Sequence, residues 1–318
     1  MKTIGIITEK AVQGFETAFS DTNEAIFHIK SQLEKKGHRV IISTNPSDHT
    51  LDIALVQSDP GIINGLQTAP KQIYLWPQNL CQKSYSISSL SHLTEVLWLS
   101  DWQRRQWSSL NPTLSRFMTL FGHGVDLSEF GPVRARENPH SCVYASQDAR
   151  GLEILLRHWA YLKMSYPKAT LDIYYGEGHW ETVTDEEMKT IRSKLATLKS
   201  LGVKEHGTAS RQEVHRALET CSMWVFPSTS PSAACMTALK AQLAGALPVA
   251  IVTQNSGDAE VLRIGAFANI ANYYDILSRI FSHIPEVSLA TRQQMSDFVR
   301  KKFTWEHLAN QLENIINK

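Results

Sequence analysis

The segment of residues 225–249, VFPSTSPSAACMTALKAQLAGALPV, constrains the fold of this chain more than any other. It consists of an apolar run of strand length, a Ser/Pro loop, a helical stretch of small residues that ends at Gly245, and a second apolar run. Strands that are apolar at every position are typical of parallel sheets, because helices cover both faces. Two such strands joined by a helix therefore predict a β–α–β unit.

Apolar runs of strand length alternate with helical patterns throughout the first part of the chain. In the stretch 21–36, apolar residues recur at helical spacing, with Asp21 as the predicted N-cap and Gly37 as the stop. The expected strands here are 3–8, 39–43, 52–57, 72–76, 95–100 and 118–121, and the expected helices are 21–36 and 101–110.

Residues 131–141, GPVRARENPHS, are polar and contain two prolines, a composition typical of a linker. After them the strand–helix alternation starts again. The expected strands are 142–146, 170–176, 203–207, 223–227 and 247–252, and the expected helices are 151–164, 185–200, 211–220, 233–244, 273–283, 289–302 and 305–316.

The pattern predicts an α/β protein with two doubly wound, Rossmann-like domains that face a central cleft. Residues 1–132 would form an N-terminal domain and residues 133–318 a C-terminal domain, with the last helix a candidate to pack back on the N-terminal domain. In such sheets ligands bind at the carboxyl ends of the strands. The expected site is therefore the cleft between the domains.

Composition narrows the classes of function. The net charge of +1 gives no overall field to recruit nucleic acid or an anionic membrane. No apolar run reaches the length of a membrane span, and the N-terminal run lacks the features of a signal peptide. The cysteines form no C-x-x-C pair, which favours a reducing compartment. We therefore expect a cytoplasmic protein. The four cysteines are Cys81, Cys142, Cys221 and Cys235.

Three strand ends in the second half carry residues suited to a ligand. Arg150 precedes Gly151 at a loop-to-helix junction, where a fixed charge beside free backbone donors suits a diphosphate. Taken alone, an exposed arginine before an ordinary helix is the favoured interpretation. Gly176 allows a ligand or another backbone to approach closely, although a plain turn is the simpler interpretation. His206 and Gly207 end the next strand, where a lone histidine is more often structural.

Serines stand at the predicted starts of two helices in this half. Ser210 and Glu213 have the spacing of a capping box. Ser230 and Ser232 are candidate N-caps for the helix 233–244, whose first N–H groups would face an anion. The small residues of this helix suit either a ligand or tight core packing. Ala233 and Ala234 are the first two of them.

The first half contributes fewer candidates. Gly14 lies in the loop after the first strand, without the second glycine of a phosphate-cradling turn. Gln78 and Asn79 follow a strand and would point amides at the cleft, and His123 lies in a turn with two glycines. The sequence contains no Walker A motif, H-E-x-x-H, G-x-S-x-G or EF-hand loop.

Taken in order, these motifs resemble those of retaining glycosyltransferases of the GT-B fold, in glycosyltransferase family 4. GHGVD at 122–126, followed by Phe130, resembles the family's N-G-V-D-x-x-x-F with His123 in place of Asn. YAS…RGL at 144–152 resembles its Y-x-S-x-x-x-R/K-G-L element, and Trp305 opens a terminal helix as in its closing segment. Further matches in the same order are YYG at 174–176, HG at 206–207, FPS at 226–228 and A-x-x-A-G-x-x-P-V at 241–249.

The resemblance implies a nucleotide-diphosphate sugar held by the C-terminal domain and an acceptor held by the N-terminal domain. Arg150 would bind the diphosphate and stabilise the leaving group as the catalytic residue, and Gly207 would lie beside the base. The helix starting near Ser232 would direct N–H groups at the sugar phosphate. The donor-binding set is Ser146, Arg150, Gly176, His206, Gly207, Ser232, Ala233, Ala234 and Lys240; the acceptor-side set is Gly14, Gln78, Asn79 and His123.

The resemblance also implies that no metal and no cofactor is needed beyond the donor itself, because cationic side chains and helix dipoles stabilise the leaving group. A glycan, a protein or a lipid-linked molecule would be the acceptor. Neither the base nor the sugar of the donor follows from the sequence.

Two departures from the family concern the donor site. The family has a glutamate that contacts the sugar and, eight positions later, a second one that contacts the ribose; here these positions are Ser232 and Lys240. A lost buried hydrogen bond to a charged group costs on the order of 1.5–3 kcal/mol. The family's first-domain histidine has no clear counterpart, and Gln78 or Asn79 lies nearest.

Three functions are compatible with this pattern. An active glycosyltransferase is favoured. The alternative is a degenerate, catalytically inactive GT-B protein that binds a glycan or acts as a partner subunit. A nucleotide-sugar epimerase is less favoured, because no acid/base pair stands out. A basic patch could contact a membrane or a lipid-linked acceptor, although a solvated face is favoured; the residues concerned are Arg104, Arg105, Arg134 and Arg136.

Overall fold

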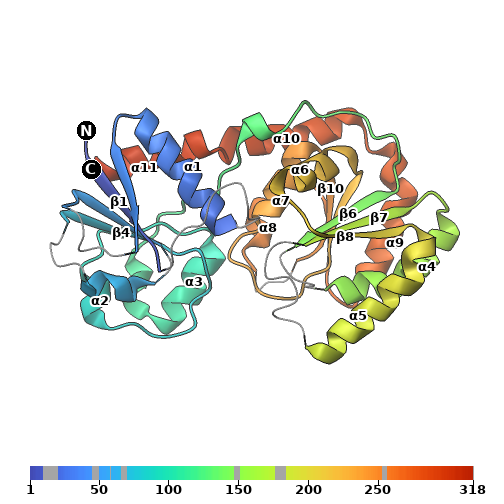
Figure 1. Cartoon of the computed structure of the whole chain (residues 1–318), viewed down its shortest axis with the longest axis horizontal. Helices are drawn as coiled ribbons and strands as arrows, with labels where there is room; N and C mark the ends of the chain where they lie inside the picture. The colour runs from blue at the N-terminus through green and yellow to red at the C-terminus, as the bar shows by residue number, and fades with distance from the viewer. Residues whose placement is uncertain are drawn as a thin grey trace.

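The computed structural model describes residues 1–9, 21–44, 50–57, 59–65, 70–146, 151–175, 184–252 and 256–317, except for the side chains of Asp21 and Tyr175. The chain forms two α/β halves that lie side by side (Figure 1). Each half contains one parallel sheet with helices packed against it. The connecting residues 131–140 contain neither helix nor strand, whereas Ser141, the last residue of the predicted linker, is the first residue of strand β6 (Ser141–Ser146).

The N-terminal half is built on a five-stranded parallel sheet with the order β2-β1-β3-β4-β5. From β1, the chain first adds β2 on one side of the sheet and then adds β3, β4 and β5 on the other. The position between β1 and β3 is therefore the topological switch point. The strands are β1 (Thr3–Ile7), β2 (Arg39–Ser43), β3 (Ile53–Gln57), β4 (Gln72–Trp76) and β5 (Glu95–Val96). The helices are α1 (Asp21–Lys35), α2 (Ile87–Ser91) and α3 (Asp101–Leu110), with 3₁₀ turns η2 (Pro60–Gly65), η3 (Pro112–Arg116) and η4 (Leu127–Glu129).

The C-terminal half is built on a six-stranded parallel sheet with the order β11-β10-β9-β6-β7-β8, whose switch point lies between β6 and β9. The strands are β6 (Ser141–Ser146), β7 (Thr170–Tyr175), β8 (Val203–Thr208), β9 (Met223–Phe226), β10 (Leu247–Ile251) and β11 (Ala266–Ala268). The helices are α4 (Leu152–Ser165), α5 (Asp185–Leu198), α6 (Arg211–Thr220), α7 (Met236–Ala244), α8 (Asp258–Val261), α9 (Tyr273–His283), α10 (Leu289–Lys302) and α11 (Trp305–Ile316), with η5 (Lys199–Leu201) and η6 (Ile284–Glu286).

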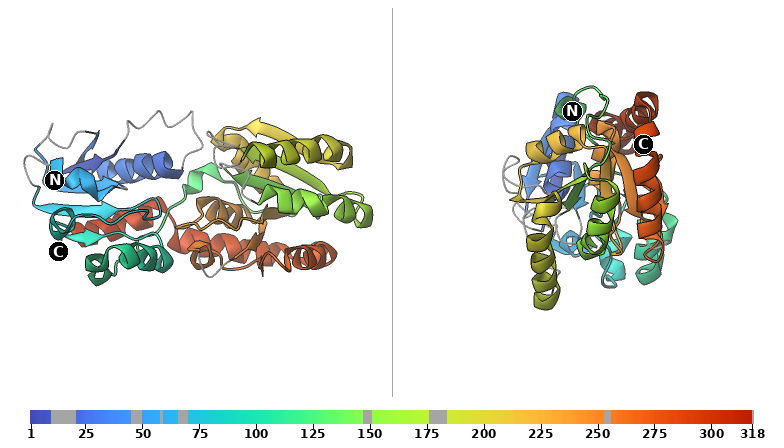
Figure 2. Two further views of the ribbon diagram at one scale, coloured as in Figure 1. Left: turned by 90° about the horizontal axis from the view of Figure 1, so that it is seen from below. Right: turned by 90° about the vertical axis from the view of Figure 1, so that its right-hand side faces the viewer.

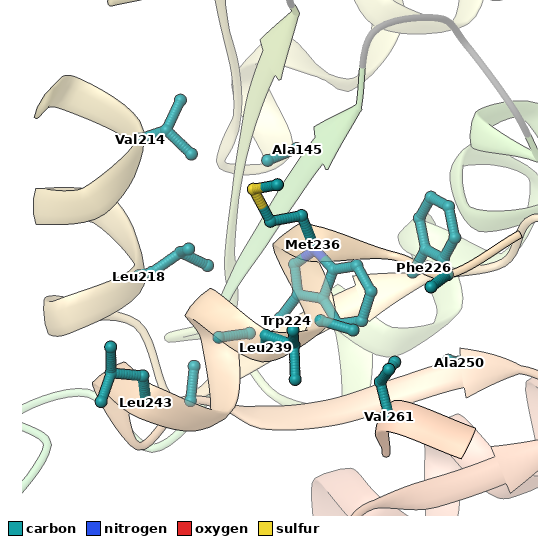
Figure 3. Close-up of a cluster of buried hydrophobic side chains, with 14 of the residues drawn as sticks. Ala145, Val214, Leu218, Trp224, Phe226, Met236, Leu239, Leu243, Ala250 and Val261 are labelled. Atoms are coloured by element: carbon teal, nitrogen blue, oxygen red, sulfur yellow. The ribbon is translucent and has the colours of Figure 1, made fainter. Parts of the chain in front are cut away.

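The core of this half forms around β9 and α7, and every residue of both elements is buried. Figure 3 shows Val214 and Leu218 of α6 pointing toward α7, with Trp224 beneath Met236. Full burial of a large apolar side chain contributes about 1.5–3 kcal/mol. The residues 225–249 thus form the central β–α–β unit that their sequence predicts.

The last helix crosses back to the N-terminal half. Figure 2 shows α10 and α11 running along one side of the molecule from one half to the other. Helix α11 packs on α1, and Glu313 lies 2.8 Å from the Nε2 atom of His38. At its start, the N–H of Val125 donates to the carbonyl of Phe303 at 2.8 Å. The C-terminal helix therefore fastens the two halves together.

The predicted start of the helix 233–244 is wrong. Helix α7 begins at Met236 with Cys235 as its N-cap, so neither Ser230 nor Ser232 caps it. The reason lies in hydrogen bonds that fix a loop instead. The carbonyl of Ser232 accepts the N–H of Gly257 at 2.8 Å, and that of Ala233 accepts the Ser100 hydroxyl at 2.5 Å.

The predicted strands 95–100 and 118–121 are also largely wrong. Strand β5 comprises only Glu95–Val96, and one parallel bridge joins Trp98 to Leu120. Ser100 ends the extended run because its side chain accepts the N–H of Gln103 and caps α3. The remaining predicted elements differ from the observed ones only at their ends.

Two helix-end predictions are confirmed. Gly37 has a φ of +87° and donates its N–H to Glu34, which ends α1. Ser210 and Glu213 form the expected capping box at the start of α6. The predicted N-cap role of Asp21 lies outside the described side chains.

Candidate functional site

A pocket of about 510 Å³ lies between the two halves. It sits beyond the carboxyl ends of β1, β4 and β9, where ligands bind in doubly wound sheets. Both halves contribute to it, and most of its lining is polar. The N-terminal half contributes Glu9, Gln78, Asn79, Leu80, Gln82, Lys83, Tyr85 and Trp107, and the C-terminal half contributes Pro231, Ser232, Ala233 and Ala234.

Gln78 is the buried polar group of the N-terminal wall. The residue is 8% exposed, and neither its amide oxygen nor its amide nitrogen has a hydrogen-bond partner among the described residues. A buried amide without partners is costly, and such groups in native structures usually meet a ligand or water. The following residue holds the loop in place, because the carbonyl of Asn79 accepts the indole N–H of Trp107 at 2.9 Å.

The C-terminal wall, residues 231–234, is a loop held from both halves. In addition to the bonds at Ser232 and Ala233, a Cβ placed on Gly257 would lie 1.9 Å from the carbonyl oxygen of Ala233, so only glycine allows this approach. Nearby, the carboxylate of Glu260 accepts the backbone N–H groups of Asp101 and Trp102, each at 2.8 Å, at the start of α3. The wall is therefore a fixed part of the domain interface.

The predicted diphosphate region is described only in part. Arg150, Gly14 and Gly176 lie outside the described residues, and Ser146 is the last residue of β6. Gly151 has a φ of +70°, and a Cβ on it would lie 1.9 Å from the carbonyl oxygen of Pro227. Gly151, just before α4, thus lies against the residue that follows β9, which explains the glycine at this position.

His206 and Gly207, on β8, have different surroundings. The Nε2 atom of His206 lies 2.6 Å from a carboxylate oxygen of Asp172, and its ring stacks on Tyr174 with 4.3 Å between centroids. The imidazole of His206 is therefore positioned by Asp172 and Tyr174 of the neighbouring strand β7. Gly207 has a φ of +73°, and beyond its own atoms and its chain neighbours no described residue has an atom within 4 Å of the position that its Cβ would take. Open space beside Gly207 is compatible with a ligand placed against the strand end.

Lys240 is buried at the interface between the halves and is absent from the pocket lining. Its Nζ lies 2.6 Å from Oε2 of Glu24 on α1, in a residue pair that is nearly inaccessible to solvent. Arg211 lies 2.8 Å from Glu129 and 4.0 Å from Glu24. The Lys240 ammonium, which the resemblance implies would lie at the ribose, therefore faces a carboxylate of the protein.

His123 is also internal. The residue is 3% exposed, is not part of the pocket lining, and its Nδ1 atom has no hydrogen-bond partner among the described residues. Burial, with a smaller effect of the Lys240 charge, lowers the pKa of His123 to about 4. Its turn packs on α11, because a Cβ on Gly124 would lie 2.6 Å from the indole of Trp305. The GHGVD and tryptophan motifs thus meet in the structure.

One group of side chains has the composition of a metal site. Ligand atoms of Glu24, His28 and Glu129 lie within 4.8 Å of one another. Lys240 and Arg211 already contact the two carboxylates. A divalent ion would have to compete with these cations at short range. The cluster is therefore a better site for ion pairs than for a metal.

The four arginines considered for a basic patch are partly engaged elsewhere. Arg104 and Arg105 both pair with Asp101, and Arg136 donates to the carbonyls of Glu219 and Ala244. In the described part of the chain, none of the helices combines the length and apolar character that a membrane crossing requires. All four cysteines are without disulfide partners.

Sequence reasoning missed the acidic side of the Lys240 contact. Glu24 and His28 are spaced by one helical turn beside the apolar stripe of α1. Because residues four apart share a helix face, this spacing next to buried positions is the signal that could have revealed them. The pocket residues Lys83, Tyr85 and Trp107 carry no comparable sequence signal.

The sequence matches no protein-family model and no curated protein. Solved structures do resemble it along its whole length. Sucrose-phosphate synthase from Thermosynechococcus elongatus is 14% identical, with a TM-score of 0.73 and coverage of 100% of this chain and 98% of the synthase. This chain has the GT-B fold.

Two further structures with this fold contain nucleotides. HepE of Anabaena in complex with UDP-glucose is 12% identical, with a TM-score of 0.73 and full coverage of both chains. The catalytic domain of starch synthase IV from Arabidopsis thaliana, bound to ADP and acarbose, is also 12% identical, with a TM-score of 0.69 and coverage of 99% and 98%.

Proposed function

We propose that this protein is a glycosyltransferase that moves a sugar from a nucleotide-diphosphate donor to an acceptor hydroxyl in the cleft between its halves. One observation carries the proposal. The interdomain pocket brings Gln78 and Asn79, predicted for the acceptor side, together with Ser232, Ala233 and Ala234, predicted for the donor side. The similarity to HepE with UDP-glucose and to starch synthase IV with ADP supports this class of donor.

In the proposed reaction the C-terminal half binds the nucleotide. The base would lie in the open space beside Gly207, and Arg150 would neutralise the diphosphate as it leaves. The unpartnered amide of Gln78 would bind sugar hydroxyls, since it offers both a donor and an acceptor in a buried position. The Ser232 hydroxyl, in the opposite wall, would contact the same sugar.

The finer features of the proposal follow the family resemblance. Transfer would retain the anomeric configuration and would use cationic side chains instead of a metal. Lys240 would not bind the ribose, because its ammonium contacts Glu24. A reducing, cytoplasmic compartment would suit four cysteines that form no disulfide. The acceptor would be a glycan, a protein or a lipid-linked molecule.

Donor hydrolysis and transfer across a panel of UDP-, GDP- and ADP-sugars test the enzymatic part of the proposal. Wild-type protein should release nucleoside diphosphate from at least one donor, and Gln78→Ala should lower kcat/KM about tenfold or more, as expected for losing 1.5–3 kcal/mol of transition-state contact. Gln294→Ala, an exposed change on α10, is the matched control. Donor binding without turnover on any acceptor would instead indicate a glycan-binding or partner subunit.

A further inference from the structure

In one cluster of ion pairs at the domain interface, the acidic and basic side chains come from opposite halves. The N-terminal half contributes carboxylates, from Glu24 on α1 and Glu129 on η4, and the C-terminal half contributes cations, from Arg211 on α6 and Lys240 on α7. The first turn of α1, which carries Glu24, is the end of the helix that faces the C-terminal half (Figure 1). We call these four residues the interdomain clasp.

The central pair of the clasp is removed from solvent. Lys240 is 0% exposed and Glu24 is 4% exposed, and their charged atoms lie 2.6 Å apart. Removing one partner of a buried pair leaves an uncompensated charge, whereas replacing both by apolar residues is often neutral. Such a pair therefore adds little net stability, but it strongly penalises any arrangement of the halves that separates the two charges.

The clasp is connected to the pocket through helix α7. Lys240 belongs to α7, and the loop 231–234 that precedes α7 forms the C-terminal wall. On the opposite side, Glu24 belongs to α1 of the N-terminal half, which also supplies Gln78 and Asn79. A change in the Lys240–Glu24 distance would move one wall relative to the other.

We infer that the interdomain clasp fixes the separation of the two pocket walls, so that Lys240 and Glu24 are positioning residues for the donor. The lysine at the family's ribose position would thus have gained a structural partner in the other half. The clasp itself does not depend on the proposed function; its effect on donor binding rests on that function.

Charge reversal tests the inference. Lys240→Glu and Glu24→Lys each place like charges together, so small-angle X-ray scattering of the ligand-free protein should show a larger radius of gyration. Each should also weaken nucleotide binding about tenfold or more, which corresponds to about 1.4 kcal/mol. The double variant Glu24→Lys/Lys240→Glu should regain most of the compactness and affinity. Lys168→Glu, an exposed reversal, is the matched control.

Two results would overturn the inference. One is a double variant with the same enlarged radius of gyration as the single variants, and the other is single variants with the radius and affinity of the wild type. If the reversals do not fold, Glu24→Gln removes only the charge at nearly constant size and should give a smaller expansion; no change in radius or affinity would again overturn it. If wild-type protein binds no nucleotide, the proposed function fails, while the scattering comparison still decides the clasp.

Discussion

Two glycines of this chain show how the surroundings of a residue decide what it contributes. Gly151 and Gly37 both have a positive φ, which L-residues rarely adopt. Only Gly151 is pressed against another loop, at the carbonyl of Pro227, whereas the Cβ position of Gly37 is open. Gly151 thus packs the start of α4 against the residues that follow β9.

Gly151→Ala should therefore destabilise the protein far more than Gly37→Ala. The second change should cost about 1–2 kcal/mol from backbone strain alone. The first adds a clash that must move the loop after β9, so we expect a loss of 3 kcal/mol or more, on the order of the largest single-site effects. Urea unfolding followed by circular dichroism measures both. Equal losses would show that the two loops are not tightly packed.

Buried histidines predict a pH dependence of stability. Burial lowers the pKa of His123 to about 4 and that of His215 to about 2, below the value of 6.5 in unfolded chains. Above pH 6.5 each imidazole is neutral in both states and has no linkage effect; as the pH falls below 6.5 only the unfolded chain takes up the proton, so the free energy of unfolding falls by about 1.4 kcal/mol per pH unit for each histidine. Burial raises the pKa of Glu129, so protonation of this carboxyl increases the free energy of unfolding as the pH falls, opposite to the effect of the histidines.

His123→Asn isolates one of these groups. Between pH 7.5 and 5.5, the free energy of unfolding of the variant should fall less steeply than that of wild type, because one proton-binding group of the unfolded chain is gone. Urea titrations at several pH values give the two slopes. Parallel slopes would mean that His123 is not kept neutral by burial.

Among the elements, strands and helix ends were readable from sequence where local chemistry decides them. The apolar runs of β9 and β10, the Gly37 stop and the Ser210 cap follow from residue type and spacing. The start of α7 could not be predicted in this way, because hydrogen bonds from Gly257 and Ser100, which are distant in sequence, hold residues 232–233 in a loop. Tertiary partners overrode a sequence of small residues and serines.

Helix α11 gives a prediction at the same scale. Trp305 is 2% exposed, contacts the Gly124 turn and stacks on His28 at 5.5 Å. Trp305→Ala should cost about 3–5 kcal/mol by opening a cavity between α11 and the N-terminal half. Tyr161→Ala, at an exposed position of α4, should change stability by less than about 0.5 kcal/mol. Denaturant unfolding compares the two, and similar losses would place the tryptophan outside the core.

For the whole molecule, sequence indicated the two-domain architecture and the general place of the pocket, because carboxyl strand ends must converge there. It could not show that Lys240 would pair with Glu24 and be absent from the lining of that pocket. The resemblance implies a donor contact for this residue, yet its partner Glu24 lies in the other half. A contact of this kind depends on how two domains are placed, which no local pattern encodes.

The central claim is that the cleft binds a nucleoside diphosphate. Isothermal titration calorimetry of the wild-type protein with UDP, GDP and ADP tests it most directly. The account predicts saturable binding of at least one of them to a single site, weakened in Arg150→Ala. An absence of binding heat and of competition with labelled nucleotide for all three would contradict it.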